Sequence, residues 1–348
     1  MHTLAVARSV HGIEHLVATE IRHAGLGIVR EVRHREVWFE ITGPGALELR
    51  MADDVLLVGA VVDGVGPRRD ALRRLASAAA GIDVHRLTTA RPLEPGALEP
   101  GALEPGGRPL ESGGGPFGVE VSASFLGRRA YNRYDIEDAV GPVLGRPYHA
   151  RRDGRVPPAG AASWRVTVEG ERAVIALRAG ARPLHRRAYK VRSVPGTLHP
   201  PLAAAMAYLA EPKGLVVDPC CGAGTTLIEA VALAPEARTL GFDRCGEAVA
   251  AAAANGPRLA WARADAGRVP LPSGSVDRVL VNPPWQRQVR LAGSGHRLWA
   301  ELRRVLADGG RVVALVPEVP RGWAVLEKVD VSLFGRHPIL AMMTPDKS

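Results

Sequence analysis

Cysteine is scarce in this sequence of 348 residues, and the few thiols exclude two classes of protein. The three cysteines, Cys220, Cys221 and Cys245, form no CxxC pair and so lack the paired spacing of a zinc site. The adjacent pair is a poor candidate for a disulfide, which argues against the cross-linked framework of a small secreted domain. We therefore expect reduced thiols and no bound metal.

Long apolar runs are also missing. No stretch approaches the ~18 apolar residues of a membrane span, and the opening MHTLAVARSVHG lacks the ~7–15-residue apolar core of a secretory signal. The hydrophobic fraction is nevertheless 46%, which excludes a disordered or fibrous chain. At roughly 100–200 residues per domain, the length predicts two or three domains. We expect a cytoplasmic, multidomain protein that does not associate with membranes.

Acidic residues are outnumbered, and one long interval contains none. Lys and Arg total 45 against 36 Asp and Glu, a net charge of +9, and no acid lies between Arg172 and Glu211. Such a run is often only a solvated face, and an Arg-rich composition also accompanies high-GC genomes. Because the interval also holds Tyr189, it equally fits a surface that contacts RNA phosphates. The candidate contacts are Arg182, Arg186, Arg187, Lys190 and Arg192.

The first 66 residues predict a small α+β domain. Strand-like and helix-like stretches alternate along it, and the stretch 12–24 has the spacing of an amphipathic helix. The strands are expected at 3–8, 28–33, 36–41 and 55–62, and the helices at 12–24 and 45–52. This βαββαβ order favours a ferredoxin-like sandwich.

A second domain is expected over residues 67–180. Asn132 is a candidate N-cap, because its side-chain oxygen can accept from the free N–H groups that begin a helix. The expected elements are helices at 68–80 and 132–144, a strand at 117–125 and a hairpin over 164–170 and 172–178.

A repeated segment over residues 91–116 interrupts this second domain. LEPGA begins at Leu93, recurs at Leu98 and returns as LEPGG at Leu103. Short Pro/Gly repeats cannot build a packed core, so they predict an extended insertion without chemistry. Residues 181–195 form a basic linker that leads to the last domain, residues 196–348.

Strand and helix alternate through the last domain, a pattern typical of a parallel sheet with helices on both faces. Ligands of such sheets bind beyond the carboxyl ends of the strands. The strands are expected at 214–218, 238–243, 258–264, 276–282 and 310–316, the helices at 199–210, 224–234, 246–254 and 296–307, and a closing antiparallel pair at 328–334 and 338–344.

A glycine turn follows the first of these strands, in the segment DPCCGAGTTL. Gly222 and Gly224 let a ligand approach the backbone, and the helix that begins at Thr225 offers free N–H groups. Neither the GxGxxG fingerprint of a nicotinamide site nor the GK[ST] of a triphosphate loop is present. Asp218 is instead suited to the charged methionine end of S-adenosylmethionine. Cys220 lies in the same turn and is a further candidate contact.

Two more acids end the next two strands. Asp243, nineteen positions after Gly224, is placed to hold a pair of ribose hydroxyls. Asp265 is placed to accept from the amino group of an adenine. Each alone would be a surface acid, but three at successive strand ends predict a cofactor site.

Asn282-Pro283-Pro284-Trp285 ends the fourth strand, where two prolines stiffen the turn. An exocyclic amine is a poor nucleophile, because its lone pair is delocalised into the base. The Asn282 side-chain oxygen and the Pro283 carbonyl could accept its two hydrogens, and stacking on Trp285 would contribute ~1–3 kcal/mol. This arrangement predicts methyl transfer that rests on positioning, with no strong general base.

With these motifs, the chain resembles the THUMP-domain RNA methyltransferases of class I, which methylate the exocyclic N2 of guanine. GIEHLVATEI and FGVEVSASFLGRRAYNRYDIEDAVG are similar to their front end, and LHRRAYK and LHPPLAAAMAYLA to the entry of their catalytic domain. DPCCGAGTTLIEA and NPPW match their cofactor and catalytic motifs. Within the family, the chain is most similar to the tRNA enzymes that act at guanosine 6 of the acceptor stem.

The resemblance implies a ferredoxin-like domain over 1–66, a THUMP domain over 67–180 and a Rossmann-like methyltransferase domain over 196–348, with a seven-stranded sheet. It implies S-adenosyl-L-methionine as cofactor, tRNA gripped by the front end, and a monomer. The implied cofactor residues are Asp218, Gly222, Gly224, Asp243 and Asp265, and the residues for the target amine are Asn282, Pro283 and Trp285. Trp285 stands where the family usually has Tyr.

Two other functions remain open. NPP followed by an aromatic residue also occurs in adenine-N6 enzymes, so an rRNA guanine-N2 or a DNA adenine-N6 methyltransferase is one alternative. A non-catalytic RNA-binding protein on a methyltransferase fold is the other, and cofactor binding would distinguish it.

Overall fold

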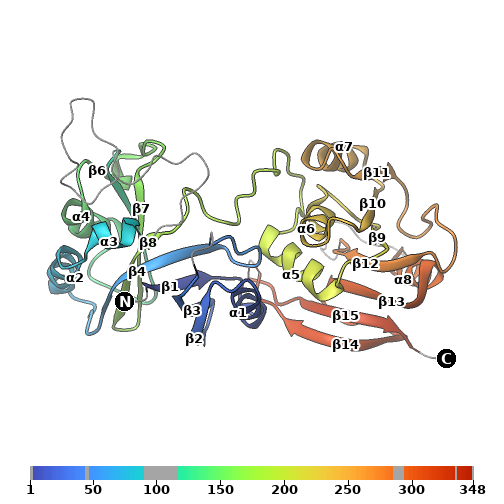
Figure 1. The fold of residues 1–348 in the computed structure, drawn as a ribbon, viewed down its shortest axis with the longest axis horizontal. Coiled ribbons are helices and arrows are strands. Elements are labelled where there is room, and N and C mark those ends of the chain that lie inside the picture. The colour runs from blue at the N-terminus through green and yellow to red at the C-terminus, as the bar shows by residue number, and fades with distance from the viewer. Residues whose placement is uncertain (1–2, 44–46, 90–116, 285–293, 334, 347–348) are drawn as a thin grey trace. The chain divides into compact units, whose positions relative to one another are not determined.

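The computed structural model describes residues 3–43, 47–89, 117–284, 294–333 and 335–346, which form two compact units (Figure 1). The first unit comprises Met1–Arg8, Ala18–Leu49 and Asp54–Leu184, and the second comprises Ser9–Val17, Arg50–Asp53 and His185–Ser348. The finer division of the sequence into four parts stays a prediction. Over the described ranges, no helix is both long and apolar enough to cross a membrane.

One eight-stranded sheet runs through the first unit, in the order β2-β3-β1-β4-β8-β7-β5-β6. Both halves of the predicted front end contribute to it, because β4 pairs with β8. Its elements are β1 (Thr3–Arg8), α1 (Glu14–His23), β2 (Gly27–Arg33), β3 (Glu36–Ile41), β4 (Asp54–Val62), α2 (Asp70–Ala80), α3 (Val84–Thr89), β5 (Val119–Phe125), α4 (Arg133–Leu144), β6 (Tyr148–His149), β7 (Ala162–Glu169) and β8 (Arg172–Arg178), with a 3-10 turn at Arg151–Asp153.

Helix α4 shows why these elements form where the sequence predicts them. The Asn132 side chain accepts from the backbone N–H groups of Tyr134 and Asp135, and Asp135 accepts in return from the Asn132 N–H. This capping box confirms the predicted N-cap. Ile136 and Val140 are fully buried on one face of the helix, which packs against β5.

The predicted helix at 45–52 is wrong over its described residues, 47–52, which adopt irregular backbone. Leu47, Leu49 and Met51 are all buried, a period of two that does not suit a helix. The carbonyl of Arg50 accepts from the Arg187 guanidinium, so it serves a residue far along the chain rather than a helical turn. Helix α3 and strand β6 were not predicted.

A seven-stranded sheet forms the second unit, in the order β11-β10-β9-β12-β13-β15-β14. The five strands from β11 to β13 are parallel, whereas β15 is antiparallel to both β13 and β14. Its elements are α5 (Pro200–Ala210), β9 (Leu215–Asp218), α6 (Thr225–Leu233), β10 (Arg238–Asp243), α7 (Gly246–Asn255), β11 (Ala260–Arg263), β12 (Val276–Val281), α8 (Ser294–Val305), β13 (Leu306–Val316), β14 (Trp323–Asp330) and β15 (Ile339–Pro345).

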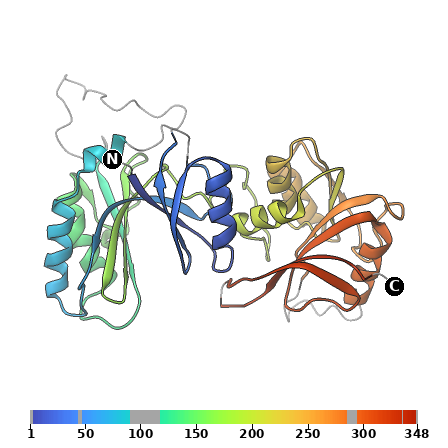
Figure 2. The ribbon, with the colours of Figure 1, turned by 60° about the horizontal axis from the view of Figure 1, so that its bottom comes forward.

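This sheet confirms the expected alternation and the closing antiparallel pair. Figure 2 shows that pair as the red hairpin of β14 and β15. β14 begins at Trp323, five residues before the predicted 328, because the indole of Trp323 is itself buried (5% exposed) and extends the strand.

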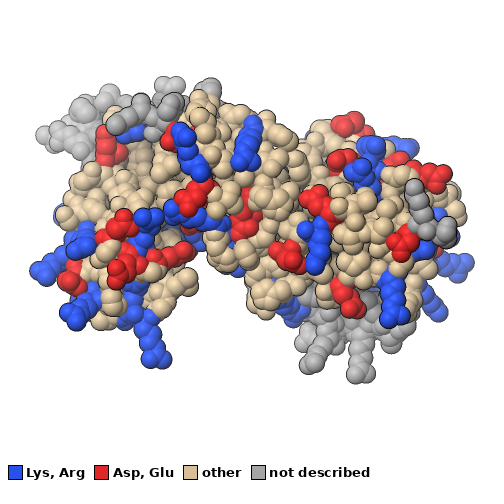
Figure 3. All heavy atoms as spheres, turned by 90° about the horizontal axis from the view of Figure 1, so that it is seen from below, with Lys and Arg blue, Asp and Glu red and all other residues tan. Residues whose placement is uncertain are grey.

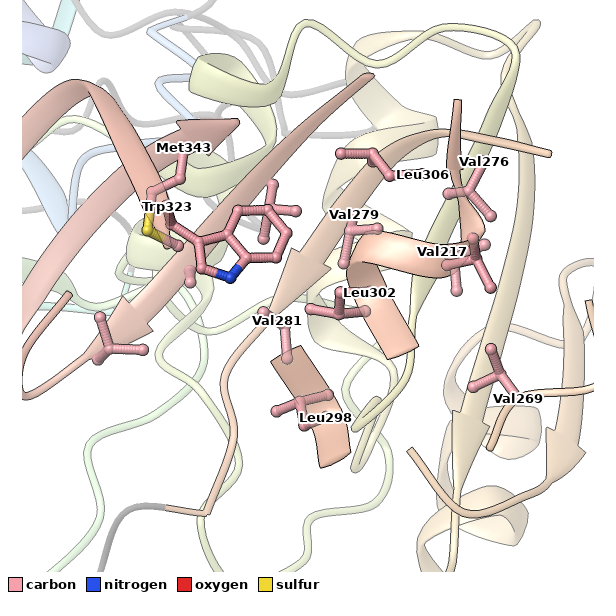
Figure 4. Packing of buried hydrophobic residues seen from close by; sticks show 14 of the residues in the cluster. Val217, Val269, Val276, Val279, Val281, Leu298, Leu302, Leu306, Trp323 and Met343 are labelled. Atoms are coloured by element: carbon pink, nitrogen blue, oxygen red, sulfur yellow. The ribbon is translucent and has the colours of Figure 1, made fainter. Parts of the chain in front are cut away.

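The core of the second unit fixes the strands that carry the candidate site. Val217 of β9 and Val279 and Val281 of β12 are buried together with Leu302 of α8. Figure 4 shows Val279, Val281 and Leu302 between the indole of Trp323 and Val217. Close packing of this kind holds the carboxyl ends of β9 and β12 in place.

Candidate active site

Four neighbouring strands bring the predicted site residues to one edge of the sheet. β9 ends at Asp218 and β10 at Asp243, while Asp265 follows β11 and Asn282 follows β12. These strands are adjacent and parallel, so their carboxyl ends meet. The order of the elements therefore assembles residues that lie far apart in the sequence.

The glycine turn is tightly fitted between β9 and α6. Gly222 and Gly224 have φ of +54° and +81°, a region that other residues rarely adopt. A Cβ on Gly224 would lie 2.6 Å from the indole of Trp261. The N–H of Cys221 donates to the carbonyl of Phe242 at 2.8 Å, which ties the turn to β10.

Asp218 is almost completely buried, with 1% of its surface exposed. Its carboxylate accepts from the Cys220 N–H at 2.9 Å and from the Thr226 hydroxyl. Burial is the main cause that raises the pKa of Asp218 to about 7, and these two hydrogen bonds oppose that rise. Asp218 thus supports the turn and changes its charge near neutral pH.

Asp243 joins the end of β10 to the same turn. One oxygen accepts from the Gly222 N–H at 3.0 Å and the other from the Cys245 N–H at 2.9 Å. A carboxylate has about four acceptor positions, so each oxygen keeps one for a hydroxyl of a ligand. Asp265 is exposed and accepts from the Gly267 N–H at 2.8 Å.

The start of α6 has the features of a ligand site. Thr225, its first residue, is buried (3% exposed), yet its hydroxyl has no hydrogen-bond partner in the part of the chain that the structure describes. A Cβ on Gly222 would meet only a methyl of Val194 at 3.9 Å, so the backbone there is open to close approach. Free polar groups at a helix N-terminus suit a polar cofactor, and these residues therefore fit S-adenosylmethionine.

Asn255, at the end of α7, is a site residue that sequence reasoning missed. Its side-chain oxygen accepts from the N–H groups of Val191 and Arg192 at 3.0 and 2.9 Å. Its amide nitrogen donates to the carbonyls of Arg192 and Ala223, both at 2.9 Å. One side chain thus fastens the basic linker over residues 181–195, called the basic segment from here on, to the glycine turn. It uses all four of its hydrogen-bonding positions. Nothing in the sequence marks it beyond its place at a helix end.

Glu229, in the middle of α6, binds two arginines. Its buried carboxylate accepts from the Arg50 Nε at 2.8 Å, the Arg187 Nε at 2.9 Å and the Tyr189 hydroxyl at 2.8 Å. Burial and this carboxylate raise the pKa of Tyr189. A lone acid among the apolar residues of TTLIEAVAL is the signal that could have indicated it.

Arg187 requires a correction, because it was a candidate RNA contact. Its guanidinium is 11% exposed and is held by Glu229 and by the Arg50 carbonyl. It therefore anchors the basic segment to α6 rather than facing an external phosphate. Of the other candidates, Arg182, Arg186 and Arg192 are exposed and Lys190 is partly buried, which lowers its pKa.

The residues for the target amine are only partly described. Asn282 is partly exposed and Pro283 is buried directly after β12. Trp285 lies outside the described residues, as does the repeated insertion at 91–116. All three cysteines are free thiols in the structure.

Comparison with known proteins identifies the second unit. A family model described as RMKL-like, methyltransferase domain matches residues 187–331, from the basic segment to the end of β14. The second unit has the fold of a class I methyltransferase domain. The glycine turn, the strand-end acids and Asn282 all lie within the matched range.

The names of two relatives agree with the activity that the motifs predict. A Thermus thermophilus protein named tRNA (guanine(6)-N2)-methyltransferase is 37% identical over 221 residues, which cover 60% of this chain and 64% of that protein. Bovine THUMPD2, named U6 snRNA (guanine-N(2))-methyltransferase, is 34% identical over 39% of this chain and 28% of its own length. The chain thus spans less than two thirds of the length of these relatives.

Solved structures resemble the whole chain. The crystal structure of TrmN from Thermus thermophilus has a TM-score of 0.72 and 26% identity, and covers 99% of this chain and 100% of its own. A Listeria monocytogenes protein described as a predicted N6-adenine-specific DNA methylase has a TM-score of 0.69 at 16% identity and covers 98% and 96%, a likeness of fold alone. The resemblance to guanine-N2 RNA methyltransferases and the class I fold are both confirmed.

Proposed function

We propose that this protein transfers a methyl group from S-adenosyl-L-methionine to the exocyclic N2 of a guanosine in tRNA, at position 6 of the acceptor stem. The observation that carries the proposal is the meeting of the Asp218 turn, Asp243 and Asn282-Pro283 at one edge of the methyltransferase sheet. The two relatives described above, both named as guanine-N2 methyltransferases, support the choice of base.

The cofactor would be held by the ends of three strands. S-adenosylmethionine supplies an electrophilic methyl group on its sulfonium. The open backbone at Gly222, the N–H groups at the start of α6 and the hydroxyl of Thr225 would receive its polar groups. The remaining proposed contacts are Asp218 and Cys220 for the methionine end, Asp243 for the ribose hydroxyls and Asp265 for the adenine amino group.

The chain's own contribution to the transfer is to prepare the amine. The side-chain oxygen of Asn282 and the carbonyl of Pro283 would each accept one hydrogen of the guanine amino group. Both acceptors draw the lone pair out of conjugation with the ring, and stacking on Trp285 would fix the base. Pro283 is well suited to hold its carbonyl, since its ring is buried and its φ is fixed.

The RNA would be positioned by its phosphates. Arg182, Arg186, Lys190 and Arg192 are the proposed contacts of the basic segment, without Arg187. On the face drawn in Figure 3, basic and acidic side chains are interspersed, so net charge alone does not mark an RNA surface there. We further propose that the protein acts as a monomer in the cytoplasm.

The variant Asn282→Ala tests this proposal. Because it removes one of two acceptors at the amine, we expect turnover on unmodified tRNA to fall by about 10²–10³, as for other preorganised polar groups. Affinity for tRNA should stay within about twofold. Asn282→Asp keeps an acceptor oxygen and should recover part of the turnover. Full activity of Asn282→Ala would overturn the assigned role, and loss of RNA binding would make Asn282 a folding residue.

A further inference from the structure

The two faces of the eight-stranded sheet in the first unit differ in chemistry. Side chains directly opposite one another on paired strands share a face. One face carries the buried Val121, Trp164 and Leu177, and α4 packs against β5 on that side. On the other face, Arg165 of β7 lies between Ser122 of β5 and Ala176 of β8.

Charged side chains cross this second face from strand to strand, and the arginines on either side of Arg165 have carboxylate partners. Arg178 of β8 donates to Asp54 at 2.8 Å and to the hydroxyl of Ser163 at 2.6 Å. Arg8 pairs with Glu36, and Arg151 pairs with Glu120 at 3.3 Å.

Arg165 is the exception. Its one hydrogen bond to a described residue is to the Ser122 hydroxyl at 3.4 Å, beyond the usual range, and it forms no ion pair with the described carboxylates. The side chain is nevertheless partly buried. Burial is the main cause that lowers its pKa, and the nearby charges of Arg8 and Arg178 add to it. The Asp54 carboxylate opposes this shift but is itself paired with Arg178.

A partly buried guanidinium without an ion pair of its own costs stability, so folding alone does not account for it. It offers five N–H donors in a planar fork, which matches the oxygens of a phosphate. The Ser122 hydroxyl accepts from Arg165 and so keeps its own hydrogen for the same anion.

We propose that Arg165 is a phosphate-binding residue on this face of the front sheet and receives a backbone phosphate of the RNA substrate. The inference rests on the proposed function for the identity of the anion. It extends that function to the first unit, in which the basic segment supplies only Arg182.

The test compares Arg165→Met with Arg178→Met, a matched control that removes a paired arginine from the next strand. Binding of unmodified tRNA is measured at several salt concentrations, and unfolding by urea. Loss of one phosphate contact makes the slope of log K against log[salt] less steep by about 0.7–0.9. Relative to 1 M salt, this is a loss of about five- to eightfold in affinity at 0.1 M salt. Arg165→Met should show this loss and unfold at no less urea than the wild type. Arg178→Met should unfold at less urea, because Asp54 loses its partner.

The outcomes separate this inference from the proposed function. An unchanged slope for Arg165→Met, a loss of its stability, or a wild type that binds no RNA would each overturn the phosphate site. If the wild type binds RNA through Arg165 but yields no methylated guanosine, the proposed function fails and the phosphate site stands. Affinity for S-adenosylhomocysteine should be equal in all three proteins.

Discussion

The hydrogen bonds by which Asn255 joins the basic segment to the glycine turn, called the Asn255 clamp below, yield the most specific prediction. Asn255→Ala removes four hydrogen bonds at once: two to the N–H groups of residues 191 and 192, and two to the carbonyls of Arg192 and Ala223. The basic segment is exposed, so water replaces its lost bonds at little cost. Ala223 is buried (2% exposed), so water does not reach its carbonyl.

The expected magnitude follows from these surroundings. A buried acceptor left unsatisfied costs about 1–3 kcal/mol, and the three bonds that water replaces add about 1 kcal/mol between them. The sum is about 2–4 kcal/mol. Since alanine has a higher helix propensity than asparagine, a loss of stability could not come from α7 itself.

Hydrogen exchange followed by mass spectrometry measures this effect locally. We expect peptides covering residues 220–224 to exchange at least about 30-fold faster in Asn255→Ala, because every 1.4 kcal/mol is a factor of ten. Affinity for S-adenosylhomocysteine, measured by calorimetry, should fall as well. Asn255→Asp keeps the acceptor but loses both donors, so it should loosen the turn in the same way. Wild-type exchange in both variants would refute the clamp.

Three further predictions concern the same domain. Glu229→Gln leaves two guanidinium groups around a neutral amide and should cost about 3–5 kcal/mol in urea unfolding; an unchanged midpoint would contradict the anchoring role. The folded pKa of Asp218, about 7, lies above its ordinary value of 3.8, so the native state binds more protons and loses stability as pH rises from about 4 to 7. Asp218→Asn should remove up to about 4 kcal/mol of that pH dependence, and parallel unfolding profiles would argue against a raised pKa. Gly224→Ala should abolish binding of S-adenosylhomocysteine, whereas Gly274→Ala, also at positive φ but with open space around it, should bind normally; equal binding would show that the Trp261 contact is unimportant.

The sequence predicted those parts of the fold that depend on local pattern. The strands at 3–8, 36–41 and 238–243 have the predicted bounds, because their apolar residues and flanking turns are local signals. The meeting of the strand-end residues at one edge of the sheet was predictable as well, since parallel strands place their carboxyl ends together whatever their spacing in the chain. The glycine turn needed no tertiary information.

Features that depend on distant partners could not be predicted. Residues 47–52 have helical composition, but the Arg50 carbonyl and Asp53 are bound by the segment at 185–199. The basic sequence around Arg187 is typical of an exposed cation. Its guanidinium is instead bound by the buried carboxylate of Glu229, 42 positions away in the chain. Arg165 stood out only once the pairing of its neighbours was known.

The central claim is methylation of a guanine amine in tRNA. The most direct test incubates the protein with labelled S-adenosylmethionine and unmodified tRNA, a matched transcript with inosine at position 6, or duplex DNA, followed by nucleoside analysis. Inosine lacks the exocyclic amine, so the account predicts N2-methylguanosine from the first RNA and no product from the other two. Methyladenine in DNA, or no product from tRNA despite cofactor binding, would contradict it.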